Sequence, residues 1–350
     1  MCQAFAKTGH EVVLLAPHDN KNYEPEVEDL YSYYGVERCF EILKLPWLPI
    51  IGRSIFYAFI AALKARRFAP ELVYCRSNPG FIFATTLRLP VIFEVHAPFA
   101  KRCRVLDWVV DKLFNSKALL KIVVITHALR QNFEKKYPSS SSKIIVAPDG
   151  ADPLPAGLLP VVFRNRGERL QVGYVGHLYA GKGMEIVSEL AGVCLWADFH
   201  IVGGTEEDIA YWKNRCNTLS NIIFHGYVAS ECVPAFILAC DVVLLPNQKN
   251  VSVYGGGGNI GEWTSPLKAF EYMSAAKPIL CSDLPVLREI FEHDRNALLC
   301  PPDDLATWAI TLARLRFDEV ARIRLGQAAH KDFIEKYTWS MRSEAIIKEP

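Results

Sequence analysis

The feature that most constrains the fold is a regular alternation of short apolar runs, rich in β-branched residues, with longer amphipathic segments. In the first half the runs are Glu11–Ala16, Leu72–Cys75, Val91–Val95, Ile122–Ile125 and Ile144–Ala147. In the second half they are Leu170–Val175, Ala197–Val202, Ile222–His225, Val242–Pro246, Pro278–Ser282 and Ala297–Cys300. This alternation indicates βαβ units with buried parallel strands. We therefore predict an α/β protein of two doubly wound, Rossmann-like parallel-sheet domains.

The length supports this division, because 350 residues exceed one typical domain and suit two of ~150–200 residues. The stretch from Pro148 to Arg169 is dense in proline and glycine, which is typical of a linker. A second break falls at Tyr337-Thr338-Trp339. The expected domains are residues 1–155 and 165–335, with a helix over 336–350 that returns toward the first domain.

The chain opens with a helix-like stretch, Met1–Thr8, followed by Gly9 and a strand. A right-handed βαβ crossover needs a parallel strand before that helix. We therefore expect the first strand of the N-terminal domain, and the loop after it, to be missing from this sequence.

Composition narrows the class of protein. Lys and Arg together number 39 against 38 Asp and Glu, whereas a general nucleic-acid binder needs a basic excess. The ten cysteines form no C-x-x-C pair, and several lie singly in apolar runs, as thiols do in a reducing compartment. The most apolar stretch, Ile50–Leu63, is too short to span a membrane and contains Arg53. The N-terminus lacks the pattern of a signal peptide, so a cytoplasmic location is expected.

The most informative segment for function is Thr264–Met273. Ser265 is expected to be the N-cap of a helix and Pro266 its first residue, with Leu267 following. The Gly-rich stretch Gly255–Gly261 precedes it, and we expect a mobile loop there. A helix N-terminus presents backbone N–H groups and a partial positive charge to a diphosphate, and Glu271 could accept both hydroxyls of a ribose. An ordinary capped helix with a solvated Glu271 is the open alternative.

Val175–Met184 is a second strand–loop–helix junction. It places Lys182 between Gly181 and Gly183 at a predicted helix start, where a compact cation suits a pyrophosphate. The spacing is not that of a Walker loop. A solvated surface lysine is the alternative interpretation.

In the first half, His96 and Arg76 each follow the end of a predicted strand, which is where ligands bind in open α/β sheets. An imidazole there can exchange a proton or hydrogen bond with a sugar hydroxyl. Asp303-Asp304 precedes a helical run and is explained by N-capping, so no metal site is predicted. Two basic amphipathic stretches, Phe56–Arg67 and Lys101–Phe114, are solvated helix faces by default, with contact to a membrane surface as the alternative.

With these segments in hand, the chain resembles the family-4 (group 1) retaining glycosyltransferases of GT-B fold over nearly its whole length. The matching segments, in order, are Gly9–Val12, Glu94–His96, Pro148–Asp152, Gly176–Leu178 with Lys182-Gly183, Gly226–Val228, Asp241–Pro246, Ser265–Met273, Lys277-Pro278 and Ser282–Pro285. Their order is more specific than any one of them.

The resemblance implies two domains that face each other across a cleft, a nucleotide-sugar donor, no metal or other cofactor, and retention at the anomeric carbon. It implies that Lys182 and Gly183 hold the diphosphate with the backbone of Ser265, Pro266 and Leu267. Glu271 would hold the ribose, and His96 would lie against the donor sugar at the reacting centre. These two are the expected catalytic residues. UDP- or GDP-sugars are the expected donors, a glycan, a lipid-linked molecule or a small molecule the acceptor, and polysaccharide biosynthesis the setting.

The sequence departs from the family pattern at two positions. The family pairs two glutamates eight positions apart, but Trp263 stands eight positions before Glu271, and Glu262 is one residue out of register. His177 stands where the family has a phosphate-binding arginine. Glu262, and Arg76 from its place after a strand, are secondary candidates for contact with the sugar or the acceptor. A nucleotide-sugar epimerase or hydrolase and a non-catalytic nucleotide-sugar-binding protein remain as alternatives. A dinucleotide-dependent oxidoreductase is disfavoured, since no strand is followed by G-x-G-x-x-G.

Overall fold

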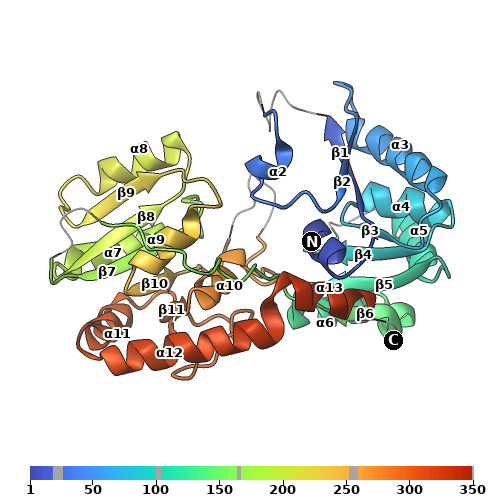
Figure 1. The fold of residues 1–350 in the computed structure, drawn as a ribbon. Coiled ribbons are helices and arrows are strands. Elements are labelled where there is room, and N and C mark those ends of the chain that lie inside the picture. The colour runs from blue at the N-terminus through green and yellow to red at the C-terminus, as the bar shows by residue number, and fades with distance from the viewer. Residues whose placement is uncertain (19–26, 100–103, 164–166, 252–258, 349–350) are drawn as a thin grey trace. The chain divides into compact units, whose positions relative to one another are not determined.

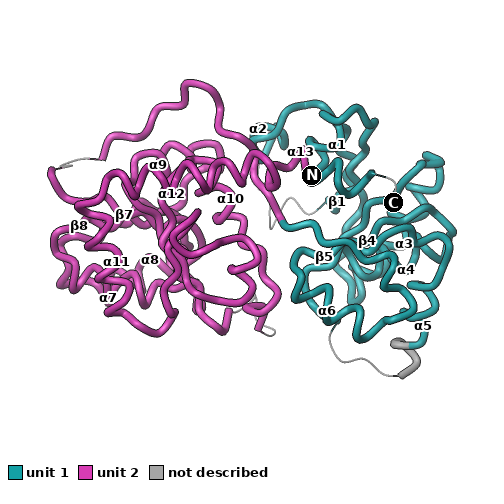
Figure 2. Tube along the Cα trace, turned by 90° about the horizontal axis from the view of Figure 1, so that it is seen from below, with its two compact units in different colours: residues 1–148, 342–350 teal, residues 149–341 magenta. Residues whose placement is uncertain are grey.

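The computed structural model describes residues 1–18, 27–99, 104–163, 167–251 and 259–348. The chain divides into two compact units (Figure 2): unit 1 is Met1–Pro148 with Arg342–Pro350, and unit 2 is Asp149–Met341. All strand pairs between the named strands are parallel. The predicted fold class, two α/β units with parallel sheets, is confirmed.

Unit 1 alternates strands and helices along the chain (Figure 1). Its elements are α1 (Cys2–Lys7), β1 (Val13–His18), α2 (Leu30–Tyr33), β2 (Glu41–Pro46), α3 (Arg53–Arg67), β3 (Val73–Cys75), α4 (Asn78–Thr86), β4 (Val91–Val95), α5 (Arg104–Phe114), β5 (Leu119–Val124), α6 (His127–Lys136), a 3-10 turn (Pro138–Lys143) and β6 (Ile144–Val146). Strands β3-β4-β5-β6 form a four-stranded sheet, and β1 pairs with β2 separately. The strand β2 was not predicted.

The core of unit 1 is aromatic. Every residue of β4 is buried, and Phe93 from this strand stacks on Phe81 of α4 with ring centroids 4.4 Å apart. Phe114 and Phe133, from α5 and α6, are also buried and pack near one another. Such burial contributes roughly 1.5–3 kcal/mol per side chain, and it fixes β4, whose carboxyl end carries Glu94 and His96.

Unit 2 is a doubly wound sheet with the strand order β12-β11-β10-β7-β8-β9. Its elements are β7 (Leu170–Val175), α7 (Met184–Val193), β8 (Ala197–Val202), α8 (Glu206–Arg215), β9 (Ile222–Gly226), α9 (Val233–Ala239), β10 (Val242–Leu245), α10 (Leu267–Ser274), β11 (Ile279–Ser282), β12 (Leu298–Cys300), α11 (Leu305–Phe317), α12 (Glu319–Asp332) and a π-helix (Phe333–Tyr337). The strands β7, β10 and β11 are buried throughout, as strands covered on both faces must be.

The chain leaves and re-enters unit 1 through two neighbouring segments. Ala151 pairs with Thr338 in an isolated parallel bridge, just after unit 2 begins and just before it ends. A last helix, α13 (Trp339–Ile347), follows, and from Arg342 onward its residues belong to unit 1. No helix of the described residues is long and apolar enough to cross a membrane.

Candidate functional site: two half-sites at the ends of strands

The order of the strands in unit 2 reverses between β7 and β10, which are neighbours in the sheet but far apart in the sequence. Ligands of open α/β sheets bind beyond the carboxyl ends of the strands at such a switch point. Two predicted segments follow these two strands. The loop containing Lys182 connects β7 to α7, and α10 is the next helix after β10.

Two glycines hold the Lys182 loop against the chain that follows β10. Gly181 and Gly183 have φ angles of +87° and +91°, a region that disfavours residues with a Cβ. A Cβ on Gly183 would lie 2.0 Å from the carbonyl oxygen of Pro246, and one on Gly181 would lie 2.2 Å from that of Asn250. Only glycine permits this approach, which fixes the backbone around Lys182.

Lys182 and His177 lie on the same loop and influence each other. The Nζ of Lys182 is 5.3 Å from the centroid of the Tyr179 ring, and burial lowers the pKa of the Lys182 ammonium. The pKa of His177 is also lowered, first by burial and then by the charges of Lys182 and Lys268. A neutral His177 cannot fully replace an arginine, so the lysines are the main cations of this half-site.

The predicted start of α10 is wrong by one residue. Helix α10 begins at Leu267, its N-cap is Pro266, and no side chain caps it. Ser265 does not serve as the cap because its hydroxyl accepts a hydrogen bond from the Asp149 N–H at 3.0 Å. Pro266 has ψ of 119°, an extended conformation outside the helix. The helix start is therefore present, and its N-terminus has no side-chain acceptor of its own.

Glu271 lies on α10 in a largely buried position, and burial raises the pKa of its carboxyl although the charge of Lys268 lowers it. Lys268 was missed at the sequence level. It lies one turn before Glu271, and residues three apart share a helix face, so its place in an otherwise apolar helix was a usable signal. Lys268 is 9% exposed, and its Nζ has no hydrogen-bond partner among the described residues.

Glu262 is exposed, and Trp263 occupies a half-buried turn, its N–H donating to the carbonyl oxygen of Ile260. In the part of the predicted loop that the structure covers, the side-chain oxygen of Asn259 accepts hydrogen bonds from the N–H groups of Val251 and Gly261, each at 2.9 Å. The remainder of that predicted loop, Gly255–Gly258, lies outside the described residues. Asp304 caps α11 by accepting from the Thr307 N–H, as its sequence context indicated.

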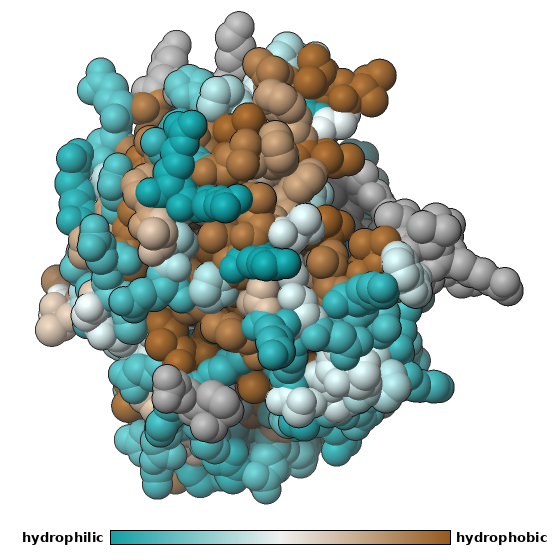
Figure 3. Space-filling view, turned by 90° about the vertical axis from the view of Figure 1, so that its right-hand side faces the viewer, coloured by the Kyte–Doolittle hydropathy of each residue, from teal (hydrophilic) through white to brown (hydrophobic). Residues whose placement is uncertain are grey.

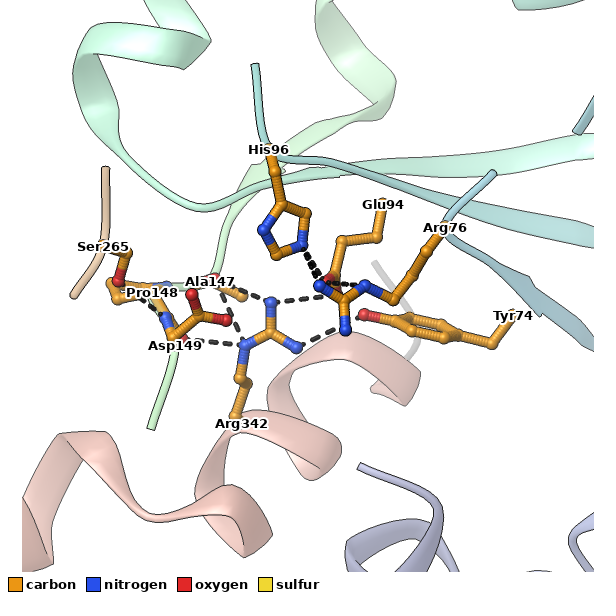
Figure 4. Close-up of polar contacts among 9 residues, drawn as sticks. All are labelled: Tyr74, Arg76, Glu94, His96, Ala147, Pro148, Asp149, Ser265 and Arg342. Carbon is orange, nitrogen blue, oxygen red and sulfur yellow. Dashed lines mark hydrogen bonds and ion pairs between the residues drawn. The ribbon is translucent and has the colours of Figure 1, made fainter. Parts of the chain in front are cut away.

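The half-site in unit 1 lies at the carboxyl ends of β3 and β4 (Figure 4). The Nε2 of His96 is 2.5 Å from the Oε1 of Glu94 and 3.0 Å from the Nη2 of Arg76. Arg76 also approaches Glu94, with its Nε 3.2 Å from the same oxygen. The structure thus brings His96 and Arg76 together and joins them to a carboxylate that was quoted in a motif but not assigned a role.

Glu94 is 1% exposed, and its second oxygen pairs with Arg342 at 2.9 Å. Burial alone would raise the pKa of Glu94, but hydrogen bonds and charges from His96 and Arg342 outweigh it and hold the pKa below its usual value. Glu94 is therefore ionised at neutral pH, so Nε2 of His96 carries the hydrogen that it donates. The Nδ1 of a neutral His96 is then left as an acceptor.

Arg342 connects α13 to this half-site. Besides Glu94, its guanidinium donates to the carbonyl oxygens of Ala147 and Pro148, at 3.1 and 2.8 Å, and to the Tyr74 hydroxyl at 3.3 Å (Figure 4). It is 3% exposed. Sequence reasoning could not find this residue, since its partner Glu94 is 248 positions away.

Comparison with known proteins identifies the family of the chain. Residues 1–153 match the model of the family "Glycosyltransferase Family 4", and residues 169–318 match that of "Glycosyl transferases group 1". The chain belongs to the group 1 glycosyltransferases. It is 22% identical over 366 residues to the uncharacterized glycosyltransferase MJ1607 of Methanocaldococcus jannaschii, covering 97% of this chain and 89% of that protein.

Two solved structures of similar fold are aligned over most of their length. The sucrose-phosphate synthase of Thermosynechococcus elongatus has a TM-score of 0.72 at 16% identity, covering 99% of this chain and 89% of that one. Anabaena HepE, solved in complex with UDP, has a TM-score of 0.68 at 15% identity, covering 88% and 85%. This group 1 glycosyltransferase therefore has the GT-B fold.

Proposed function

We propose that this glycosyltransferase transfers a sugar from a UDP- or GDP-sugar to a glycan, a lipid-linked molecule or a small molecule, with retention at the anomeric carbon and without a metal ion. The observation that carries the proposal is the pair of lysines at the switch point of unit 2, of which Lys268 is buried and Lys182 half-buried. The proposal favours UDP, because the similar protein HepE has been solved with UDP and with UDP-glucose.

In this proposal unit 2 binds the donor. The ammonium of Lys182 and the backbone of Gly183 contact the diphosphate, together with the uncapped N-terminus of α10 at Leu267. Glu271 accepts the ribose hydroxyls. These cations also favour the charge that develops on the departing diphosphate, which is the main way such a site lowers the barrier.

In unit 1, His96 is the proposed contact to the donor sugar. Because Glu94 fixes its Nε2, the imidazole is held in one orientation and one tautomer, and Nδ1 is offered to a sugar hydroxyl. Arg76, which is exposed and reaches the same carboxylate, is proposed to contact the sugar or the acceptor. Glu262 is assigned the same type of contact in unit 2.

The donor assignment is tested by isothermal titration of UDP, GDP and ADP. Lys182→Ala is expected to weaken binding about 10- to 100-fold, the loss of one charge-assisted contact of about 1.5–3 kcal/mol. The exposed Lys213 on α8 supplies the matched control, Lys213→Ala. Glu271→Gln is compared with Glu189→Gln on the exposed face of α7. Equal affinities for all four variants and the parent would refute the donor site.

Retention and metal independence are tested on the reaction itself. The anomeric configuration of the product, followed by proton NMR from the first turnovers, is expected to equal that of the donor. Turnover is expected to survive a chelator such as EDTA at millimolar concentration. An inverted product refutes the first expectation, and activity lost to EDTA and restored by Mg²⁺ or Mn²⁺ refutes the second.

We further propose that unit 1 contacts the cytoplasmic surface of an anionic membrane, where a lipid-linked acceptor would be found. Ile55, Phe56, Phe59 and Leu63 form an exposed apolar stripe along α3, and Figure 3 shows apolar side chains gathered on this face. Arg66 and Arg67 follow at the end of the same helix. This arrangement is typical of an interfacial helix. The described cysteines are thiols, which suits a reducing compartment.

Co-sedimentation with vesicles tests the membrane contact. Binding to vesicles that contain phosphatidylglycerol is expected to exceed binding to pure phosphatidylcholine, and Phe59→Asp is expected to abolish it. The control is Ile310→Asp on α11 in unit 2, another exposed apolar side chain. Equal loss in both variants, or no binding by the parent, would contradict the proposal.

A further inference from the structure

Lys268 places an ammonium group in a buried position where the described residues do not neutralise its charge. Its side chain is 91% buried in the first turn of α10, yet its Nζ makes no hydrogen bond to any described residue. The Nζ lies over the face of the Tyr174 ring, 4.2 Å from its centroid. An isolated buried ammonium is costly, and a ring face compensates only part of the cost.

The position of the ammonium indicates what it serves. A Cβ on Gly176, the first residue after β7, would lie 3.5 Å from Nζ of Lys268, so the ammonium lies beside the turn that leads to Lys182. The neighbours of Lys268 on α10, Ala269, Phe270, Tyr272 and Met273, are buried and apolar or aromatic. Methionine or leucine would satisfy the packing at this position, and a lysine therefore requires another explanation.

The charged and titratable groups around Lys268 do not neutralise it. They come from β7, the following loop, α10 itself and β11: Tyr174, His177, Lys182, Glu271, Tyr272 and Cys281. Lys182 adds a second positive charge, and burial raises the pKa of Glu271, which weakens the carboxylate as a counterion. The phenols and the thiol are neutral, since burial raises the pKa of each. The half-site is short of negative charge.

A ligand that carries two or more negative charges removes this imbalance. We propose that Lys268 is a second cation for the diphosphate of the sugar nucleotide, beside Lys182, and that its Nζ takes up a proton from solvent when the diphosphate binds. This inference rests on the proposed function and adds a specific residue and a proton to it. The proton returns to solvent when the nucleotide product leaves, so no net charge is consumed over a turnover.

The electrostatics of the free protein agree with the direction of this exchange. Burial, and after it the charge of Lys182, lowers the pKa of Lys268 from 10.5 to about 7. A fraction of the molecules therefore has a neutral Lys268 at neutral pH, and the fraction increases above it. An anion next to the group favours the charged form and raises the pKa again. Binding and protonation are then linked.

Calorimetric titration of UDP measures the proton directly. The binding enthalpy is determined at pH 8 in Hepes, Tricine and Tris, whose ionisation enthalpies differ. The slope of the binding enthalpy against the ionisation enthalpy of the buffer gives the number of protons taken up. The parent protein is expected to take up about one proton per UDP. Lys268→Met is expected to reduce this number to near zero and to weaken UDP binding about 10- to 100-fold. His177→Asn is expected to retain the uptake, which excludes the imidazole as its source.

Two controls distinguish this role from a structural one. Lys213→Met, at the exposed site on α8, is expected to match the parent in affinity and proton uptake. The melting temperature of Lys268→Met is expected to equal or exceed that of the parent, since the variant removes an unpaired buried charge. If Lys182→Ala loses UDP while Lys268→Met keeps the parent's affinity and proton uptake, the inference is overturned and the proposed function stands. If the parent binds none of UDP, GDP and ADP, both fail.

Discussion

Replacing Lys268 by methionine is expected to stabilise the protein by an amount that changes with pH. The two side chains have similar length, and methionine adapts to irregular surroundings. What is removed is an ammonium with no hydrogen-bond partner among the described residues and with Lys182 as a neighbour.

The magnitude follows from the pKa of Lys268, which is about 7 in the folded protein against 10.5 for an unperturbed lysine. At about 1.4 kcal/mol for each pKa unit, this difference corresponds to ~5 kcal/mol at most. Above pH 10.5 the lysine is neutral in both the folded and the unfolded state, so burial of its charge does not lower the free energy of unfolding. As the pH falls from 10.5 to 7, the unfolded state gains a proton that the folded state does not bind. The cost therefore grows over this range and is constant below pH 7.

The assay is urea unfolding followed by tryptophan fluorescence at pH 7, 8, 9 and 10. Lys268→Met is compared with Lys213→Met, which corrects for the loss of a lysine at an exposed site. At pH 7 the free energy of unfolding of Lys268→Met is expected to exceed that of Lys213→Met by about 3–5 kcal/mol. This difference is expected to shrink steadily toward pH 10. The m value, which is the slope of the free energy of unfolding against urea concentration, should be equal for the two variants. A difference that does not change with pH, or a variant less stable than the control, would refute the reasoning.

Three further predictions concern other residues. Arg342→Met is expected to lower the stability of unit 1 by about 3–5 kcal/mol, because it leaves the buried Glu94 carboxylate without its buried cationic partner; the urea midpoint of this variant is compared with that of Arg67→Met, which replaces an exposed arginine on α3. Gly183→Ala is expected to abolish detectable UDP binding, since its Cβ would meet the Pro246 oxygen at 2.0 Å; Gly167→Ala, where a Cβ meets nothing within 4 Å, should bind normally. The stability that ionised Glu94 contributes is present above pH 4.5 and lost as the pH falls through its lowered folded pKa; Glu94→Gln should unfold with a flatter pH dependence below 4.5.

The strands that the sequence reveals most clearly are those buried on both faces. A run such as Val242–Leu245 contains no polar residue, because both faces of β10 are covered by protein. Strand β2 escaped prediction for the opposite reason: Glu41 and Lys44 interrupt its pattern, and it pairs only with β1. The start of α10 was misplaced because the hydroxyl of Ser265 bonds to Asp149 instead, a contact across 116 positions that no local rule contains.

The residues of the candidate site could also be predicted only where local sequence pattern determines them. Lys182 and Glu271 follow from helix starts and from the resemblance, since both depend on local pattern. The network around Glu94 does not, because it needs the tertiary pairing with Arg342. Lys268 could be predicted from the sequence only in part. Its spacing from Glu271 was visible, but only the structure shows that its ammonium is buried, unpaired and beside Gly176.

The pairing of Glu94 with Arg342 also determines the order in which the two units can finish folding during synthesis on the ribosome. The two residues are 248 positions apart, and all of unit 2 lies between them. At 5–20 residues per second, Glu94 is synthesised about 12–50 s before its partner. During that time the sheet of unit 1 must keep the carboxylate hydrated or protonated, while unit 2, a continuous segment, can fold as soon as it emerges. The nascent chain is therefore expected to complete unit 2 before α13 completes unit 1.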